Sequence, residues 1–297
     1  MIFSSSAAMN YDGDIIRPPS EADSIIIQVT VGCSHNHCTF CGAYKNKSFR
    51  IRSDEEIAEN IALAEKHCTG QQRVFLADGD ALILSQRRLL KIFSQIKSSL
   101  PWVHRISMYG NAKAIRSKSI AELRELKTRG LHRIYMGLES GDNTLLAAVK
   151  KGETGESMIQ AAELVRAAGV FLSVTVLLGL GGIINSLSHA RESGRVLSRM
   201  QPSQIAALCL MPLANTPLGK DYASGSFQLP DAQGMLLELR ELIRNLDCNR
   251  VQFMANHASN YLPLSGRLMR DRDSMLQKIE QALRGDYPLV PEYYRAL

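Results

Sequence analysis

The stretch SIIIQVTVGCSHNHCTFCGAY, residues 24–44, joins a strand pattern directly to a group of cysteines. Its first part is largely apolar and β-branched, which is typical of a strand buried on both faces of a parallel sheet. Beyond Gly32, three cysteines lie close together in the chain, at Cys33, Cys38 and Cys41. We therefore predict a buried strand whose carboxyl end leads into a cysteine-containing loop.

The same pattern of a strand followed by a helix is repeated along the chain. The expected strands cover residues 24–31, 73–78, 103–109, 132–139, 170–179 and 204–211. The expected helices cover residues 54–67, 86–99, 119–129, 156–168, 186–199 and 235–246. Strict alternation requires parallel strands joined by right-handed crossovers, a rule that a doubly wound sheet and a barrel both meet. Because a complete barrel has ~8 such units, six of them predict an α/β fold of the partial (βα)6 TIM-barrel type.

This organisation divides the chain into three expected segments. Residues 1–23 carry no strand or helix pattern and are expected to form a poorly ordered N-terminal arm. Residues 24–230 are expected to form the partial barrel. Residues 231–297 are expected to supply the last barrel helix and a C-terminal capping segment with a helix at 274–283. In such folds ligands bind at the carboxyl ends of the strands, which is where the cysteine loop begins.

The composition is that of an ordinary globular protein, since 45% of the 297 residues are hydrophobic and 22% are charged. The net charge of +6 is not concentrated in one run, so a solvated mixed-charge surface is favoured over a nucleic-acid-binding surface. The cations between Lys45 and Arg52 are expected on an exposed loop, with binding of a substrate phosphate or carboxylate as the alternative. No apolar run reaches the ~20 residues that span a bilayer, and the N-terminus does not resemble a signal peptide. We therefore expect a cytoplasmic protein that does not contact a membrane.

The C-x4-C-x2-C spacing indicates a metal site rather than disulfides in a chain without an export signal. Three thiolates on a four-iron cubane leave one iron open for a ligand. His35 and His37 keep a second interpretation open, a tetrahedral zinc knuckle. Zinc modules usually stand alone because the metal replaces a core, whereas this loop follows a buried strand. The remaining cysteines, Cys68, Cys209 and Cys248, show no ligand spacing and are expected to be small buried hydrophobes.

The cysteine loop resembles that of the radical S-adenosylmethionine (radical SAM) superfamily. The usual spacing in that family is C-x3-C-x2-C, with an aromatic residue directly before the third cysteine, and Phe40 occupies that position. The additional residue between Cys33 and Cys38 departs from the usual spacing, although longer spacings occur in the superfamily. The run LLAAVKKGET, residues 145–154, is similar to the methylthiotransferase and Elongator-like branch of single-cluster members.

The resemblance implies two cofactors, a [4Fe–4S] cluster held by Cys33, Cys38 and Cys41 and S-adenosylmethionine (SAM) chelated by the open iron. It implies that one electron cleaves the sulfonium of SAM to methionine and a 5′-deoxyadenosyl radical, which abstracts hydrogen from a substrate. A reducing partner such as flavodoxin or ferredoxin is the expected source of that electron.

The resemblance also implies which residues contact SAM. In LADGDAL, after the second strand, Asp78, Gly79 and Asp80 match a Gly-Gly-Glu-like motif whose carbonyls hold the methionyl amino group. A plain Asp-Gly turn is the alternative interpretation. At the end of the fourth strand, Glu139 matches the residue that accepts the ribose hydroxyls, and Ser140 lies beside it. Pairing of Glu139 with a lysine, or capping of the next turn, is the alternative.

The fifth strand ends in LLGLGG, in which Gly179 matches the region that flanks the adenine of SAM. Phe40, next to the third cysteine, is assigned to the same cofactor-binding set. The glycines would equally suit a tight turn that binds no ligand.

Two polar segments are expected to contact the substrate. SMYGNAK, at the end of the third strand, offers Tyr109 and Asn111, and NHASNYLP in the tail offers His257, Asn260 and Tyr261. A capping tail would place the second segment over the open barrel. The alternative is that these side chains hold the tail in place through hydrogen bonds.

These expectations describe a radical SAM enzyme that acts on a small molecule, with no catalytic residue assigned. Sulfur insertion is disfavoured because the three dispersed cysteines do not form a second set of cluster ligands. Modification of RNA or of a protein is the alternative within the superfamily, although no appended nucleic-acid domain is visible. The alternative from a different class is a zinc-knuckle nucleic-acid-binding protein.

Overall fold

The computed structural model describes residues 9–296, and the chain divides into two compact units. The first comprises Met1–Asn36, Ala43–Tyr135 and Leu164–Val170, and the second comprises His37–Gly42, Met136–Glu163 and Phe171–Leu297. Two elements, β6 (Leu131–Glu139) and α6 (Gly155–Ala167), run through both units. The cysteine loop does so as well, with Cys33 in the first unit and Cys38 and Cys41 in the second.

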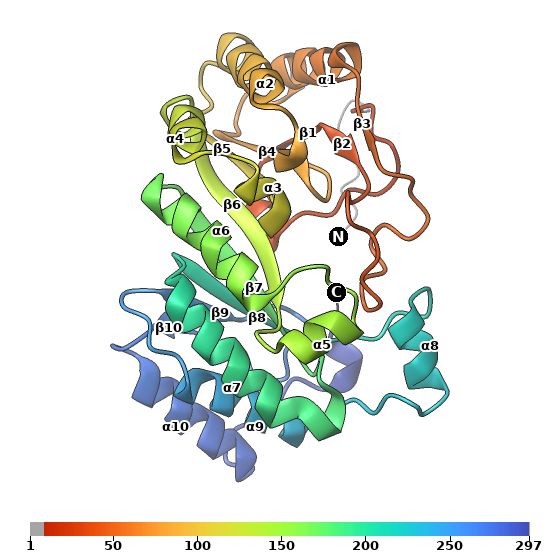
Figure 1. Ribbon diagram of the computed structural model, residues 1–297, viewed down its shortest axis with the longest axis vertical. Helices are drawn as coiled ribbons and strands as arrows, with labels where there is room; N and C mark the ends of the chain where they lie inside the picture. Colours follow the sequence, from red (N-terminus) through yellow and green to blue (C-terminus); the bar gives the residue numbers. More distant parts are fainter. Residues whose placement is uncertain (1–8, 297) are drawn as a thin grey trace. The chain divides into compact units, whose positions relative to one another are not determined.

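Four parallel strands form the sheet of the first unit, in the order β1, β4, β5 and β6 (Figure 1). They are β1 (Ile25–Gln28), β4 (Arg73–Ala77), β5 (Arg105–Tyr109) and the start of β6. The register pairs Gln28 with Ala77 and Leu76 with Met108, so the carboxyl ends of β1, β4 and β5 lie together, whereas β6 continues to Glu139 beyond Tyr135, the partner of Tyr109. The helices are α1 (Asp54–His67), α2 (Gln86–Ser99), α3 (Ala112–Arg116) and α4 (Ile120–Thr128).

A small antiparallel sheet closes the base of the cysteine loop. β2 (Thr30–Val31) follows β1 almost directly and pairs with β3 (Arg50–Ile51). The expected strand at 24–31 is therefore two short strands, of which only the first belongs to the parallel sheet. The pairing of Val31 with Arg50 brings the two ends of the loop together.

α1 shows how the local sequence determines where a helix begins and which face it buries. Glu56 N donates to Ser53 Oγ at 3.1 Å, and Ser53 N donates to the Glu56 carboxylate at 2.7 Å. This capping box satisfies two backbone donors that the first turn leaves without partners. Ile57, Ile61 and Ala64 lie one turn apart and are buried, on a helix that contacts β1 and α2.

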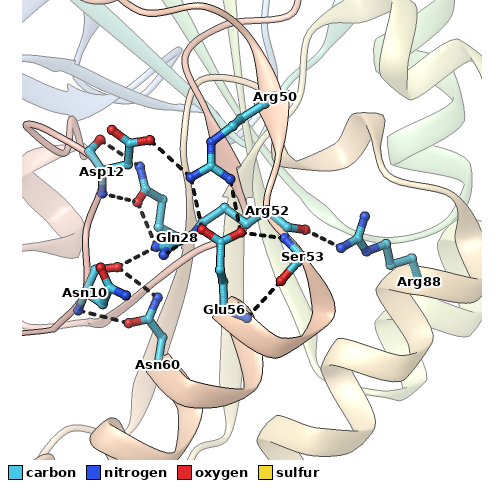
Figure 2. A network of polar contacts seen from close by, with 9 residues as sticks. All are labelled: Asn10, Asp12, Gln28, Arg50, Arg52, Ser53, Glu56, Asn60 and Arg88. Carbon is cyan, nitrogen blue, oxygen red and sulfur yellow. Dashed lines mark hydrogen bonds and ion pairs between the residues drawn. The ribbon is translucent and has the colours of Figure 1, made fainter.

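The N-terminal arm is packed onto the first unit over residues 9–23. In the network of Figure 2, Asn10 O accepts a hydrogen bond from Arg52 Nη1 at 2.5 Å. In the same network Asp12 N donates to Gln28 Oε1 at 2.8 Å. Arg52 is only 1% exposed, so the arm supplies a hydrogen-bond acceptor to a buried guanidinium. The expectation of a poorly ordered arm is therefore wrong for these residues, and the rest of the arm lies outside the described part of the chain.

The second unit continues from the end of β6 in the strand order β6, β7, β8, β9 and β10 (Figure 1). β7 (Phe171–Leu178), β8 (Gln204–Cys209) and β9 (Gln252–Ala255) are parallel, and β10 (Leu264–Arg267) is antiparallel to β9. The helices are α5 (Asn143–Ala148), α7 (Gly182–Met200), α8 (Pro217–Ala223), α9 (Ala232–Arg244) and α10 (Arg272–Leu283). α9 packs against both α7 and α10, which lie alongside it in Figure 1.

The predicted fold class is confirmed, because the chain has a mixed α/β fold with a mostly parallel sheet of eight strands. All six expected strands are present, and the helices predicted at 54–67 and 86–99 have those bounds. The tail adds β9 and β10, which the expectation of a tail helix alone missed. Within the described residues, no helix is long and apolar enough to cross a membrane. The division into arm, barrel and cap stays a prediction.

Two of the three dispersed cysteines lie in the protein interior. Cys209 and Cys248 are buried as predicted, and burial raises the pKa of each thiol to about 12. Cys68 is half-buried, which is less than we expected. None of the cysteines in the described residues forms a disulfide.

Candidate cluster and cofactor site

The first part of the cysteine loop folds back onto the turn that follows the loop. Asn36 has a left-handed backbone conformation with φ of 40°, which asparagine tolerates better than most residues. Its Nδ2 donates to Tyr44 O at 2.7 Å, and Lys45 Nζ donates to Asn36 O at 3.0 Å. Asn36 is thus a point at which the long spacer between the first two cysteines reverses direction.

Asp78 ties this turn to the residue that precedes Cys33. Its buried carboxylate accepts a hydrogen bond from the Tyr44 hydroxyl at 2.6 Å and another from Gly32 N at 3.3 Å. Lys47 Nζ lies 3.8 Å from the same carboxylate. Burial raises the pKa of Asp78, whereas the Tyr44 hydrogen bond and the Lys47 charge oppose that shift.

Asp80 holds the residue that follows Cys33. Its fully buried carboxylate accepts hydrogen bonds from Ser34 Oγ at 2.6 Å and from Asn111 Nδ2 at 2.7 Å. Burial raises the pKa of Asp80 to about 6, against the lowering effect of the hydrogen bonds from Ser34 and from the backbone N–H of Asn111. Asn111 Oδ1 also accepts from Ala114 N at 2.7 Å and so caps α3. The structure therefore gives the side chain of Asn111, which we predicted to contact substrate, three partners within the protein, namely Asp80, Ser34 and Ala114.

Gly79 lies between the two aspartates and against the first cysteine. A methyl group on its Cα would lie 2.7 Å from the Tyr44 ring and 3.1 Å from Cys33 Cβ, which is too close for either neighbour. The carboxylates of Asp78 and Asp80 accept hydrogen bonds from other residues of the protein. The groups of this segment that remain to bind a ligand are therefore those of its backbone. Backbone carbonyls are the groups that the resemblance assigns to the methionyl amino group.

The second part of the cysteine loop is held between α5 and α8. Thr39 N donates to Val149 O at 3.0 Å, and Leu218 N donates to Thr39 O at 3.0 Å. Asn215 Nδ2 adds a hydrogen bond to Gly42 O at 3.0 Å. Phe40 packs against an apolar cluster of Val149, Leu180, Leu210 and Leu218. The aromatic residue before the third cysteine thus anchors this part of the loop in the second unit.

The donor set of the loop fits an iron–sulfur cluster. Cys33, Cys38 and Cys41 are each half-buried, so their thiols are partly shielded from water. Among residues 9–296, no three side chains of His, Cys, Asp or Glu converge as they would on a single metal ion. Three cysteines in one loop match the donor set of a cubane that binds each thiolate to a different iron and leaves the fourth iron open.

Glu139 ends β6 with its carboxylate folded back over the strand. Its backbone is left-handed with φ of 64°, and Gly137, two residues earlier, leaves the space that the side chain fills. Glu139 Oε1 pairs with Lys151 Nζ at 2.9 Å, and each side chain is 15% exposed. The lysine pairing that we gave as an alternative is therefore present.

Ser140 is fully buried and bonded to α7. Its Oγ lies 2.8 Å from His189 Nδ1, and Asp142 N donates to the same Oγ at 3.0 Å. His189 Nε2 lies 3.2 Å from Leu177 O on β7. Burial lowers the pKa of His189 to about 4, so the imidazole is neutral at pH 7. A neutral ring can donate from Nε2 to Leu177 and accept at Nδ1 from the serine hydroxyl.

Glu238 of α9 completes this buried network at the end of β7. Its carboxylate accepts a hydrogen bond from Gly179 N at 2.6 Å and another from Ser186 Oγ, and lies 3.4 Å from His189 Nε2. Burial raises the pKa of Glu238 to about 7. The backbone N–H of Gly179, which we assigned to the adenine region, is therefore held by a carboxyl group of α9.

The substrate residues predicted at the end of β5 and in the tail have structural partners. Tyr109 makes edge contacts with the rings of Phe75 and Tyr135, with centroids 5.2 and 6.0 Å away. In the tail, His257 Nδ1 lies 2.9 Å from Ser259 Oγ, Asn260 Nδ2 donates to Ala207 O at 2.9 Å, and the Tyr261 hydroxyl donates to Glu292 at 2.6 Å. These are the contacts of the alternative interpretation, in which the tail residues hold the tail in place.

The lysines and arginines that follow the cysteine loop contact other residues of the protein. Lys45 and Lys47 contact Asn36 and Asp78 as described, and Arg50 donates to both oxygens of Glu56 at 3.0 Å. The neighbouring Arg52 is buried in the network of Figure 2. The expectation of an exposed loop therefore holds for Arg50 but not for Arg52.

Sequence reasoning missed several residues of this site, above all His189 and Glu238. Both occupy positions on the buried faces of amphipathic helices. On α9, Glu238 lies between Met235 and Leu239, where the apolar spacing calls for a hydrophobic residue. A charged residue at such a position is the signal that could have drawn attention to it, because buried carboxylates are rare without a partner.

The model of the radical SAM superfamily matches residues 27–186, which is more than half of the chain. The chain belongs to the radical SAM superfamily. Radical SAM proteins are enzymes, and the cofactors of the superfamily are a [4Fe–4S] cluster and SAM, so these two predictions are confirmed at the level of the family. The proposed kinship with the Elongator-like branch stays a prediction.

Among curated proteins, this radical SAM chain is similar to the 4′-phospho-dehydrooxetanocin synthase of Priestia megaterium. The two are 24% identical over 193 residues, which cover 59% of this chain and 26% of the relative. The chain thus spans about a quarter of the length of that relative.

The fold is shared with solved structures of radical SAM enzymes. The methyltransferase TsrM from Kitasatospora setae, with cobalamin and a [4Fe–4S] cluster bound, has a TM-score of 0.55 at 18% identity, over 67% of this chain and 36% of TsrM. Methylornithine synthase has a TM-score of 0.52 at 18% identity, over 76% of this chain and 63% of that enzyme. Coproporphyrinogen III oxidase from Escherichia coli has a TM-score of 0.55 at 16% identity, over 74% of this chain and 51% of that enzyme. At these identities the likeness shows the fold alone.

Proposed function

We propose that this radical SAM enzyme binds one [4Fe–4S] cluster through Cys33, Cys38 and Cys41 and cleaves SAM reductively. When bound, the cluster would supply the electron that converts SAM to methionine and a 5′-deoxyadenosyl radical, which takes hydrogen from a small-molecule substrate. The electron comes to the protein from a reducing partner such as flavodoxin or ferredoxin.

The observation that carries this proposal is the pair of buried aspartates around the first cysteine. Asp78 accepts a hydrogen bond from Gly32, directly before Cys33, and Asp80 accepts one from Ser34, directly after it. Two buried carboxyls are costly to desolvate, and both are used to hold the residues that flank one thiol. Such an arrangement supports a role for Cys33 as a ligand that must be held at a defined position.

The remaining assignments to SAM follow the ends of the strands. The backbone of the Asp78–Asp80 segment is proposed to hold the methionyl amino group. Glu139 and Ser140 are proposed to hold the ribose, and Gly179 and Phe40 to flank the adenine. The pairing of Glu139 with Lys151 engages Oε1, and the proposal assigns the ribose hydroxyls to the other carboxylate oxygen.

The test is formation of 5′-deoxyadenosine by the protein purified anaerobically and reconstituted with iron and sulfide. The reaction contains SAM and dithionite, and the control is the triple variant Cys33→Ala, Cys38→Ala, Cys41→Ala. We expect the product from the wild type alone, together with the brown colour and iron content of a four-iron cluster. A colourless protein that holds zinc in place of iron would contradict the proposal and support the zinc-knuckle alternative.

A further inference from the structure

A fully buried polar network connects the ends of two strands in the second unit. Ser140, which follows β6, contacts His189 of α7. Gly179, which follows β7, contacts Glu238 of α9. The side chains of His189 and Glu238 lie 3.4 Å apart and are both fully buried. Through this contact, the segment assigned to the ribose and the segment assigned to the adenine are joined by one buried group of polar side chains.

We propose that Glu238 and His189 are positioning residues for the nucleoside end of SAM. Glu238 fixes the backbone at Gly179, and His189 fixes the hydroxyl of Ser140, so that both segments are held in place before SAM binds. This inference rests on the proposed function, because it assumes that these segments bind SAM.

The cost of this network argues that it does more than fill the core. A carboxyl buried without a cationic partner is unfavourable, and apolar residues of similar size generally stabilise such positions better. His189 does not supply that cation, since its lowered pKa leaves the imidazole neutral at pH 7. A glutamate at this position of α9 is therefore explained by what its oxygens accept, namely the Gly179 N–H and the Ser186 hydroxyl.

The same two helices are also joined at the surface, which provides a matched control. Glu241, one turn beyond Glu238 on α9, pairs with Arg191 of α7 at 2.7 Å. This pair joins the same helices but contacts neither Ser140 nor Gly179. Substitutions at Glu241 should therefore perturb the α7–α9 contact without affecting the strand ends.

The experiment compares Glu238→Gln with Glu238→Met in the reconstituted full-length protein. Glutamine keeps an oxygen acceptor for Gly179, whereas methionine has similar length and fills the space without accepting a hydrogen bond of comparable strength. Glu241→Met is the control. The quantities measured are the Kd for SAM by equilibrium dialysis, the KM and kcat for 5′-deoxyadenosine formation, the iron content and the melting temperature.

We expect Glu238→Gln to bind SAM within about twofold of the wild type, and Glu238→Met to bind about tenfold more weakly, which corresponds to ~1.4 kcal/mol. The KM for SAM should rise in the methionine variant, while kcat at saturating SAM and the iron content stay within about twofold. Glu241→Met should leave the Kd unchanged.

Equal SAM affinity of the glutamine and methionine variants would overturn the inference, because the role of Glu238 would then be packing alone. A loss of iron in Glu238→Met in step with its loss of affinity would also overturn it. A wild type that holds a cluster but neither binds nor cleaves SAM would instead contradict the proposed function itself.

Discussion

At the scale of single residues, the first part of the cysteine loop depends on the backbone conformation of Asn36 and on the missing side chain of Gly79. Asn36 adopts a left-handed conformation in the spacer and bonds to Tyr44. Gly79 is packed so closely against Tyr44 and Cys33 that it has no room for a side chain. These residues are not expected to contact substrate, yet the position of the first thiol depends on them.

Replacement of Asn36 should separate the backbone requirement from the hydrogen bond. Asn36→Gly keeps access to φ of 40° and should hold nearly as much iron as the wild type. Asn36→Val places a β-branched residue in a left-handed conformation, which costs about 1–3 kcal/mol, and should hold less iron after reconstitution. The measurement is iron and sulfide per chain; equal content in the two variants would show that the left-handed turn is not required.

Replacement of Gly79 by alanine should destabilise the first unit by about 1–3 kcal/mol, because the new methyl group would overlap Tyr44 and Cys33. Gly70→Ala is the matched control, since a methyl group there meets nothing within 4 Å. Urea unfolding of the apoprotein measures both. Equal stability of the two variants would mean that the loop moves away at no cost.

At the scale of elements, a residue that caps a helix can also hold neighbouring segments in place. Glu56 closes the capping box of α1 and also pairs with Arg50 and Arg52, through which β3 and the N-terminal arm are attached (Figure 2). These contacts lower the pKa of Glu56 to about 2, with the Arg50 hydrogen bond as the largest cause. One carboxylate thus connects a helix, a strand and the arm.

α4 begins with the same capping box, formed by Ser119 and Glu122, and therefore offers a comparison. Glu122→Ala should cost about 1 kcal/mol, the usual value of a cap. Glu56→Ala should cost roughly 1 kcal/mol more, because it also removes a partner of the buried Arg52. Urea unfolding at pH 7 measures the difference between the two variants. A difference near zero would mean that Arg52 is satisfied by Asn10 and Gln28 alone.

At the scale of the whole molecule, two buried carboxyls and one buried histidine have opposite effects on how the stability changes with pH. The pKa values of Asp80 and Glu238 are raised to about 6 and about 7, so the folded protein holds these protons more tightly than the unfolded chain. Their contribution to stability is complete near pH 4 and is lost as the pH rises through those values. The pKa of His189, lowered to about 4, acts in the opposite sense below pH 6.5.

The contribution of Glu238 can be isolated with the glutamine variant. Because glutamine does not ionise, Glu238→Gln should gain stability relative to the wild type as the pH rises from 5 to 8, on the order of 2 kcal/mol in total. Urea unfolding at unit pH intervals measures this difference. Glu241→Gln should show no such trend in that range, since the pKa of Glu241 is lowered by its contact with Arg191. A flat difference for Glu238→Gln would show that the pKa of this carboxyl is not raised in the folded protein.

The parts of the molecule that the sequence predicts well are those determined locally. The helix at 54–67 follows from its cap and its apolar spacing, and the cysteine loop follows from three residues in one short stretch. β9 and β10 could not be predicted in this way, because four residues show no period and each strand depends on pairing with its neighbours, β9 with β8 and β10, and β10 with β9. The same holds for Glu238, since its burial depends on α7 and β7, which lie far from it in the chain.

The attachment of the N-terminal arm bears on where this chain could be cut. The stretch that matches the superfamily, residues 27–186, begins after Asn10, whose carbonyl accepts a hydrogen bond from the buried Arg52. It also ends before Glu238, which satisfies Gly179. The matched stretch therefore draws hydrogen-bond partners from both sides of itself. A fragment cut at its two ends would leave Arg52 and the Gly179 N–H each without one buried partner, so the boundaries of the family match are poor boundaries for expressing a fragment.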